Sequence, residues 1–450
     1  MEVLPQTPGR QIEHVTGRMR SVRSLLTAAA AAAVAVACLT SPVNAVSSSS
    51  GAGAPHQGQN CKREGDVVKV GTGADRIKLQ CTKVAGSGKR APIWQYKGPA
   101  STKMLKHCTI LDNDYDIDDM MAIPLVLGGK HVAAIVQSEG YTMPDEAAPA
   151  ADRLVNHVPG SKARQIPIIV GGEQSVSPDL NRWPWLRFFR SMMNQSNGLM
   201  PAKPAPWAKS STYPQQVARS VSNCTSVSIL IIGTYTSFNK YLPLIKDKVD
   251  RVVIMGQPIG DNSRTPGRES FNCNYDLRAC QEAMPLLAQV RTFFVDIPRF
   301  PDCHGGTPAA RCYTPNYEMV AGHKNAKGKR VGGLEKKGLP GHLRTALINN
   351  IDCSSFYTTA ETKGHPCNSR STWEPTAVAK GPGGEMLLWD QTAAMFLLQP
   401  GAFSLYYPPE DPSIGGKHYE PTLVNGSDAQ TIKKLRTMWT RFTNKAVRIR

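Results

Sequence analysis

A dense cluster of carboxylates directly follows an apolar segment near residue 110. The apolar run ends at Leu111, five aspartates fall between residues 112 and 119, and a Met/Ala/Ile/Leu pattern at helical spacing then begins. This order predicts a buried strand, a tight turn and a helix that starts near Asp118. The carboxylates therefore lie at the carboxyl end of a strand, where open α/β sheets bind their ligands.

Five like charges in one turn repel one another, and a bound cation would neutralise them. Ca²⁺ and Mg²⁺ are hard ions that take oxygen ligands. A solvated acidic loop is the alternative, but such loops seldom follow an apolar strand so directly. An EF-hand counted from Asp112 is excluded, because Ile117 and Ile123 stand where it needs Gly and Glu. Phosphatases that form an aspartyl-phosphate fit poorly, because they usually carry Thr or Val in place of Asp116.

The segment from Asp112 to Asp119 resembles the nucleoside hydrolase signature D-x-D-x-x-x-D-D, which lies between a strand and a helix. Most members of that family have Pro-Gly in the middle of the signature, where this chain has Tyr115-Asp116. The purine-preferring branch of the family is more variable at these two positions. The resemblance implies a Ca²⁺-dependent hydrolase that cleaves ribonucleosides, preferably purine nucleosides, to ribose and free base.

Three later segments resemble the family's other motifs, so the likeness extends, with gaps, over residues 103–398. Residues 231–237 resemble the turn strand-T-G-P-L-T-N, and residues 252–272 resemble an apolar strand with Met-Gly followed by T-P-x-x-E-F-N. Residues 387–394 resemble the start of an Ala-rich helix at which most relatives carry His-Asp. Here Trp389 replaces that His, as in the purine-preferring branch.

The resemblance implies a metal site and a general base. The Ca²⁺ ligands would be three carboxylates and one backbone carbonyl, from Asp114, Asp119, Asp390 and Ile232. Asp114 would also take the proton of the attacking water. Asp112 would orient the other carboxylates without touching the ion.

The resemblance also implies a nucleoside pocket. Its residues would line the base or hold the ribose hydroxyls: Met255, Asp118, Asn262, Glu269 and Asn272. Because no His is present to protonate the departing base, Trp389 would stack on a purine and raise its proton affinity. Four aromatic residues are open candidates for the opposite face of the base: Tyr141, Trp183, Trp185 and Trp207.

From Lys103 onward, strand patterns alternate with helix patterns. This predicts an α/β fold with a mostly parallel open sheet and helices on both faces. Besides the strand near residue 110, strands are expected at residues 132–136, 166–170, 227–232, 251–255 and 290–295. Residues 300–385 are expected to form a Gly-, Pro- and Lys-rich insertion in a catalytic domain of residues 103–450. An amphipathic helix is expected at residues 386–398.

Residues 1–45 have the pattern of an export signal, with residues 1–18 as a candidate upstream extension. An Ala/Val run follows two arginines, and Val43-Asn44-Ala45 offers a small-residue cleavage site. Secretion is expected, and a lipid anchor at Cys38 on the cell surface is the alternative. Residues 46–59 are typical of a flexible linker. Residues 60–99 are expected to form a small β module closed by a disulfide between Cys61 and Cys81.

Export also accounts for the cysteines. One of the 11 lies in the signal, which leaves ten in the mature chain. In an oxidising compartment most of these should pair. Cys61–Cys81 and Cys303–Cys312 are the expected local bridges. Zinc binding is the alternative, but no C-x-x-C pair occurs.

Composition limits the partners. The formal net charge of +18 fits anionic surroundings, but neither zinc-finger spacing nor an aromatic-interleaved basic helix occurs, so no specific nucleic acid is expected. No apolar run is long enough for a comfortable transmembrane span. A small-molecule nucleoside is the expected partner, and a homo-oligomer is left open. Two other functions stay open: the same fold acting on another ribosyl or sugar compound, and a non-catalytic surface-binding protein.

Overall fold

The computed structural model describes residues 55–71, 76–83, 91–158, 165–174, 206–256, 270–295, 320–345, 347, 389–406 and 417–448. All of these belong to one compact unit, Ala54–Arg450. The predicted export signal, most of the predicted linker and most of the predicted insertion lie outside the described residues.

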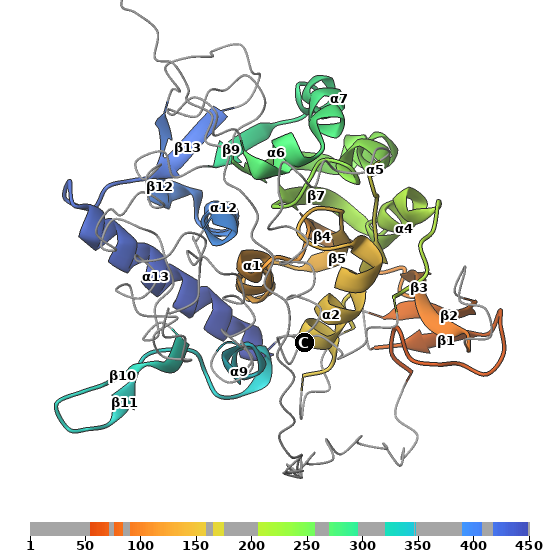
Figure 1. Ribbon diagram of the computed structural model, residues 1–450, viewed down its shortest axis with the longest axis horizontal. Helices are drawn as coiled ribbons and strands as arrows, with labels where there is room; N and C mark the ends of the chain where they lie inside the picture. The colour runs from red at the N-terminus through yellow and green to blue at the C-terminus, as the bar shows by residue number, and fades with distance from the viewer. Residues whose placement is uncertain are drawn as a thin grey trace, which may run out of the picture. The chain divides into compact units, whose positions relative to one another are not determined.

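An eight-stranded sheet forms the centre of the fold (Figure 1). Its strands are β4 (Leu105–Asn113), β5 (Val132–Gln137), β6 (Ile168–Val170), β7 (Cys224–Ile231), β8 (Val249–Met255), β9 (Thr292–Val295), β12 (Phe403–Tyr406) and β13 (Lys417–Pro421). The spatial order is β12-β13-β9-β8-β7-β4-β5-β6, and every neighbouring pair is parallel except β12 and β13. The predicted α/β fold with a mostly parallel sheet is therefore confirmed.

Helices cover both faces of the sheet, and each face has its own apolar core (Figure 1). One core contains side chains of α1 (Ile117–Leu127), α2 (Pro144–Asn156), α9 (Gly338–Thr345), α12 (Trp389–Leu398) and α13 (Asp428–Lys445). The other contains side chains of α4 (Tyr213–Ser220), α5 (Phe238–Ile245), α6 (Phe271–Tyr275) and α7 (Leu277–Leu287). The described residues also contain three short 3₁₀ turns, η2 (Lys246–Lys248), η6 (Pro400–Ala402) and η7 (Ala446–Arg448). Because strand side chains alternate, Leu111 enters the first core and Ile110 the second.

The order of the strands reverses at β4. From β4 the chain forms β5 and β6 on one side, and it then returns to the other side of β4 to form β7, β8 and β9. Open α/β sheets bind ligands at such a reversal, outside the carboxyl ends of the strands. Asp112 and Asn113 end β4, and Ile231 ends β7 beside it. The predicted carboxylates and the predicted carbonyl ligand thus meet at this point.

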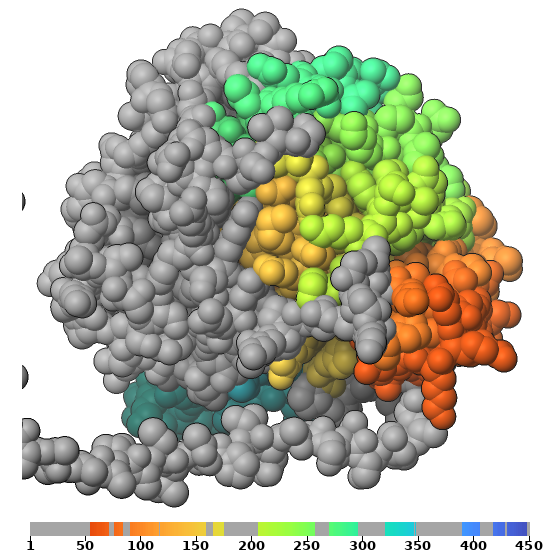
Figure 2. Space-filling view, turned by 45° about the vertical axis from the view of Figure 1, so that its right-hand side comes forward, coloured from red at the N-terminus to blue at the C-terminus, as the bar shows by residue number. Residues whose placement is uncertain are grey.

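A small antiparallel sheet precedes the large one and consists of β1 (Val67–Val70), β2 (Ile77–Thr82) and β3 (Ile93–Pro99). The predicted disulfide Cys61–Cys81 is present. Buried side chains of the small sheet share a core with α4 and α5. The Gln57 side chain pairs with the backbone of Ile168, on β6, through hydrogen bonds of 2.8 and 3.1 Å. The small sheet is therefore packed against the α/β unit (Figure 2).

Part of the predicted insertion is described. Residues 320–345 contain the hairpin of β10 (His323–Lys324) and β11 (Arg330–Val331), and then α9, which buries Leu339 and Leu343. The bridge predicted between Cys303 and Cys312 lies outside the described residues. No helix in the described part of the chain is long and apolar enough to cross a membrane.

Among the described residues, two further disulfides tie the α/β unit together: Cys108–Cys224 and Cys273–Cys280. Cys108 and Cys224 lie on β4 and β7, towards the strand ends opposite the carboxylates. Their sequence separation is 116 residues, against 7 for Cys273–Cys280. In the chain-entropy account, a crosslink over a longer loop restricts the unfolded chain more.

Replacing Cys108 and Cys224 together by serine should lower the free energy of unfolding by about 2–5 kcal/mol. Urea denaturation of the folded chain measures the change. The control is the double replacement of Cys273 and Cys280 by serine, which opens a much shorter loop and should cost less. Equal losses in the two variants would contradict the loop-length explanation.

Candidate metal centre

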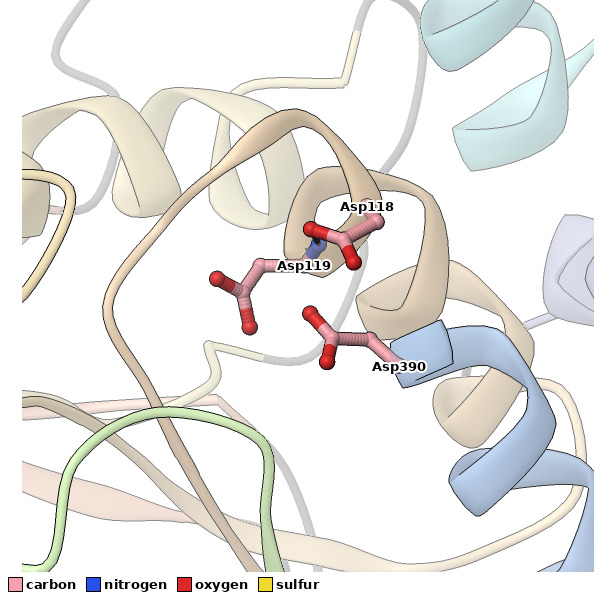
Figure 3. Close-up of side chains that lie close together, drawn as sticks. All are labelled: Asp118, Asp119 and Asp390. Atoms are coloured by element: carbon pink, nitrogen blue, oxygen red, sulfur yellow. Dashed lines mark hydrogen bonds between the residues drawn. The ribbon is translucent and has the colours of Figure 1, made fainter. Parts of the chain in front are cut away.

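Three carboxylates converge at the amino ends of two helices (Figure 3). Asp118 and Asp119 lie in the first turn of α1, and Asp390 lies in the first turn of α12. One carboxylate oxygen from each residue lies within 4.8 Å of the other two. The two helices pack against each other, so both amino ends favour negative charge in the same space.

Burial makes this cluster costly when all of its members are ionised. Desolvation, followed by the charges of neighbouring aspartates, raises the pKa of Asp119 and of Asp390 well above the ordinary value. Desolvation also raises the pKa of Asp118 to about 7. The charge of Asp114 contributes to the raised pKa of all three groups. Asp114 is therefore an electrostatic member of the same cluster.

A hard divalent cation fits this arrangement. Asp119 Oδ1 and Asp390 Oδ1 are buried and accept no hydrogen bond from the described residues. Buried carboxylate oxygens without donors are unfavourable unless a cation pairs with them. The converging atoms are all oxygens, which suits Ca²⁺ or Mg²⁺ better than the metals that prefer sulfur or nitrogen.

The loop after β5 holds Asp114 in place. The backbone N–H of Tyr141 donates to Asp114 Oδ2 at 2.7 Å, and the Thr142 hydroxyl donates to the Asp114 carbonyl at 2.7 Å. Gly140 permits this approach, because a Cβ at that position would clash with the Asp114 carboxylate. The side chain of Asp114 is thus fixed beside the other carboxylates.

Tyr115 takes a left-handed backbone conformation, with φ of 57°. Such a conformation costs a bulky residue about 1–2 kcal/mol, and strain of this kind gathers at functional sites. The Tyr115 side chain is fully buried in the core beneath α1. This burial holds the turn in place.

Ile232 directly follows β7, next to the end of β4. The Ile232 N–H donates to the Asp112 carbonyl at 2.8 Å, and the Ile232 carbonyl accepts from Asn272 Nδ2 at 2.9 Å. A carbonyl oxygen has two lone pairs, so one remains for an ion. Gly233 follows, and a Cβ there would lie 2.7 Å from the Asp114 nitrogen. The missing side chain therefore lets the ends of β4 and β7 approach.

Tyr141 is the aromatic candidate that lies beside the carboxylates. Its ring packs on Phe271 with the centroids 4.6 Å apart. Burial, and then the charges of the surrounding aspartates, raise the pKa of its phenol well above the ordinary value. The phenol therefore stays protonated next to the cluster.

The predicted tryptophans lie in different places. Trp389 is half-buried at the start of α12, next to Asp390, and packs against the core. Trp207 is buried near the small sheet, where its indole covers Gly58 and lines a small cavity with Gln95. Trp183 and Trp185 lie outside the described residues. Tyr141 is therefore better placed than Trp207 to face Trp389 across a ligand.

Of the other predicted site residues, some lie within the described part of the chain and some do not. Asp112 is fully buried on β4, and desolvation raises its pKa to about 7. Met255 is half-buried at the end of β8. Asn262 and Glu269 lie outside the described residues. The geometry groups Asp118, rather than Asp114, with Asp119 and Asp390, while the individual roles of all these residues remain predictions.

Sequence reasoning missed the residues that support the cluster from behind. Gln391 Nε2 donates to the Asp118 carbonyl at 3.0 Å and so joins α12 to α1. Ser138 donates to the Asp112 carboxylate from the loop after β5. A signal for Ser138 existed, because polar residues follow the apolar run at 132–136 just as aspartates follow the run that ends at Leu111.

Comparison with known proteins gives one family. Residues 109–424 match the family described as inosine-uridine preferring nucleoside hydrolase. The sequence matches none of the curated proteins. A solved purine-preferring ribonucleoside hydrolase from Gardnerella vaginalis is 14% identical, with a TM-score of 0.45 over 75% of this chain and 99% of that chain. An inosine-uridine preferring nucleoside hydrolase from Bacillus anthracis is 14% identical, with a TM-score of 0.39 over 74% of this chain and 99% of that chain.

Ca²⁺ should raise the melting temperature of the protein, because a ligand bound only by the native state stabilises it. In Asp390→Asn this rise should be lost or strongly reduced. The same variant should be at least as stable as wild type in chelator, because one of the mutually repelling carboxylates is gone. Circular dichroism melts at pH 7.5, with chelator and with Ca²⁺, measure both effects.

The control for this experiment is Asp247→Asn, which neutralises an exposed aspartate in η2. It should melt like wild type in both conditions. An undiminished Ca²⁺-dependent rise in Asp390→Asn would show that the ion binds elsewhere.

Proposed function

Because the chain belongs to the inosine-uridine preferring nucleoside hydrolase family of metal-dependent N-glycosyl hydrolases, we propose that it is a Ca²⁺-dependent enzyme that prefers purine ribonucleosides. The proposal is carried by the meeting of Asp118, Asp119 and Asp390 beside Asp114, at the point where the strand order reverses. The intact carboxylates argue against a protein that only binds a surface.

Cleavage of an N-glycosidic bond passes through a sugar with oxocarbenium character. The reaction needs a positioned water, a hold on the ribose and relief of the charge on the departing base. We assign to Asp114 the role of general base, which accepts the proton of the attacking water. The Tyr141 N–H donates to Asp114 Oδ2 at 2.7 Å and fixes the carboxylate beside the other acids, where it can take up that proton. A bound Ca²⁺ would chiefly position and polarise that water.

We assign the grip on the ribose hydroxyls to Asp118 and Asn272. Asn272 is buried, and its amide is anchored on the Ile232 carbonyl, so it lies next to a proposed ion ligand. Its amide has further hydrogen-bonding capacity for a hydroxyl. Asn262 and Glu269 are assigned towards the 5′ end, and Met255 to the wall of the pocket, on the family resemblance. Holding the sugar in one orientation lowers the entropic part of the barrier.

The purine preference is proposed from the residue beside Asp390. A nucleobase leaves more readily when it is protonated, and stacking between aromatic rings raises the proton affinity of a purine. Trp389 would form one face of such a stack, and Tyr141 the other. Tyr141 is supported because it packs on Phe271 next to the carboxylates. Pyrimidines present a smaller ring to this stack.

We further propose that the enzyme is exported. The signal-like pattern of residues 1–45 supports this. So do three disulfides among the described residues, because disulfides persist in oxidising compartments and are rare in reducing ones. A lipid anchor at Cys38 would place the same enzyme on the cell surface.

A nucleoside panel tests the proposed function. Inosine, adenosine and guanosine should release their bases far faster than uridine and cytidine do. Chelation should abolish release, and added Ca²⁺ should restore it. Full activity after exhaustive chelation would contradict the ion assignment. Turnover of another ribosyl compound alone would favour the alternative substrate class, and release from no compound would favour a binding role.

Trp389→Ala should lower kcat for inosine at least tenfold, which corresponds to about 1.4 kcal/mol of barrier. The affinity for Ca²⁺ should not change, because Trp389 supplies no ligand atom. Trp389→Phe keeps an aromatic face and should retain most of the activity. Steady-state kinetics on inosine and uridine distinguish a Trp389 that stacks on the base from a Trp389 that only packs in the core. Unaltered purine kinetics in a folded Trp389→Ala would defeat the stacking proposal.

A further inference from the structure

A buried pair of hydroxyls lies behind the metal centre. The Ser138 hydroxyl donates to Asp112 Oδ1 at 2.5 Å and lies 2.6 Å from the Ser237 hydroxyl. The Ser237 oxygen also accepts the backbone N–H of Gly172 at 2.8 Å. The side chains of Asp112, Ser138 and Ser237 are each 0% exposed. A continuous hydrogen-bonded chain therefore runs from Gly172 to Asp112 with no exposed member.

This chain joins the ends of four adjacent strands. Asp112 lies on β4, Ser138 follows β5, Gly172 follows β6, and Ser237 lies between β7 and α5. All four ends are at the carboxyl edge of the sheet, where the strand order reverses. The backbone is shaped for the contact, because a Cβ on Gly171 would clash with the Ser237 hydroxyl.

The backbone around the proposed ligands is hydrogen-bonded to members of this hydrogen-bonded chain. Ser138 N–H donates to the Asn113 carbonyl at 2.8 Å, directly before Asp114. The Ile232 N–H donates to the Asp112 carbonyl at 2.8 Å. A shift of Ser138 or of Asp112 would therefore move Asp114 and the Ile232 carbonyl relative to each other.

We propose that Ser138 and Ser237 are positioning residues for the ion. They hold Asp112 and the ends of β4 and β7, so that Asp114 and the Ile232 carbonyl keep the separation that Ca²⁺ requires. The proposal rests on the proposed function for the identity of the ion. The two serines act through Asp112, on the side of the sheet that faces α5.

Groups that orient metal ligands without touching the metal typically change metal affinity by about 10- to 100-fold when they are removed. A buried serine that only satisfies its own hydrogen bond changes stability instead. The dissociation constant of the ion therefore distinguishes the two roles, whereas a melting temperature does not.

Titration calorimetry with Ca²⁺ alone, on the whole protein, tests the proposal. Ser138→Ala and Ser237→Ala should each weaken Ca²⁺ binding by about 10- to 100-fold. The double variant should bind Ca²⁺ only a little more weakly than the more strongly affected single variant does. Both changes interrupt the same hydrogen-bonded chain, and such effects are not additive. Either single variant carries the test if the other does not fold.

The matched control is Ser220→Ala. Ser220 is also a buried serine, and its hydroxyl donates to the Val217 carbonyl at 2.7 Å within α4. Its removal should lower the melting temperature and leave the Ca²⁺ affinity unchanged. Wild-type affinity in Ser138→Ala and Ser237→Ala, with only the stability loss of Ser220→Ala, would overturn this proposal alone. A wild-type protein that binds no Ca²⁺ would overturn this proposal and the ion assignment together.

Discussion

Repulsion among buried carboxylates is the constraint on which the rest of the site depends. Burial, and then the charges of neighbouring aspartates, raise the pKa of Asp119 and of Asp390 well above the ordinary value, and burial raises the pKa of Asp118 to about 7. Two helix amino ends favour charge there, but they supply partial charges only. A hard cation is the partner that satisfies the remaining oxygens, and the chemistry proposed for the site follows from holding it.

The fold brings these groups together from distant parts of the sequence. The reversal at β4 places the end of β7 next to Asp114, and α12 supplies Asp390 from 276 residues farther along the chain (390 − 114). Glycines at positions 140 and 233 let neighbouring loops approach Asp114 closely. Cys108–Cys224 joins the same two strands towards their other ends. The central pair of strands is thus fixed by a disulfide on one side and by hydrogen bonds on the other.

The sequence predicted the features that depend on local pattern. Apolar runs identified β4 to β9, and the aspartates identified the edge of the sheet at which these strands have their carboxyl ends. β13 was missed, because Lys417–Pro421 has few apolar residues and becomes a strand by pairing with β12 and β9. α13 and β12 were not predicted either. The small sheet was expected as a small β module, and its packing against α4 could not be inferred from its own residues.

Within the site, the sequence identified the acids but not their relative positions. Asp118 was expected to hold the ribose, which stays a prediction, and the sequence did not indicate that its carboxylate lies with Asp119 and Asp390. Trp207 and Tyr141 were equal candidates until packing placed Trp207 over Gly58. The left-handed turn at Tyr115 was also beyond prediction, because burial of its ring in the core compensates for the strain.

The central claim is that one divalent ion completes the carboxylate cluster. Long-wavelength anomalous diffraction from a crystal grown with saturating Ca²⁺ tests it most directly. The account predicts one strong peak between Asp119 and Asp390, at about 2.3–2.6 Å from their oxygens, with the Ile232 carbonyl in the same shell. A map without a peak among these carboxylates, or with its strongest peak elsewhere on the protein, would contradict the account.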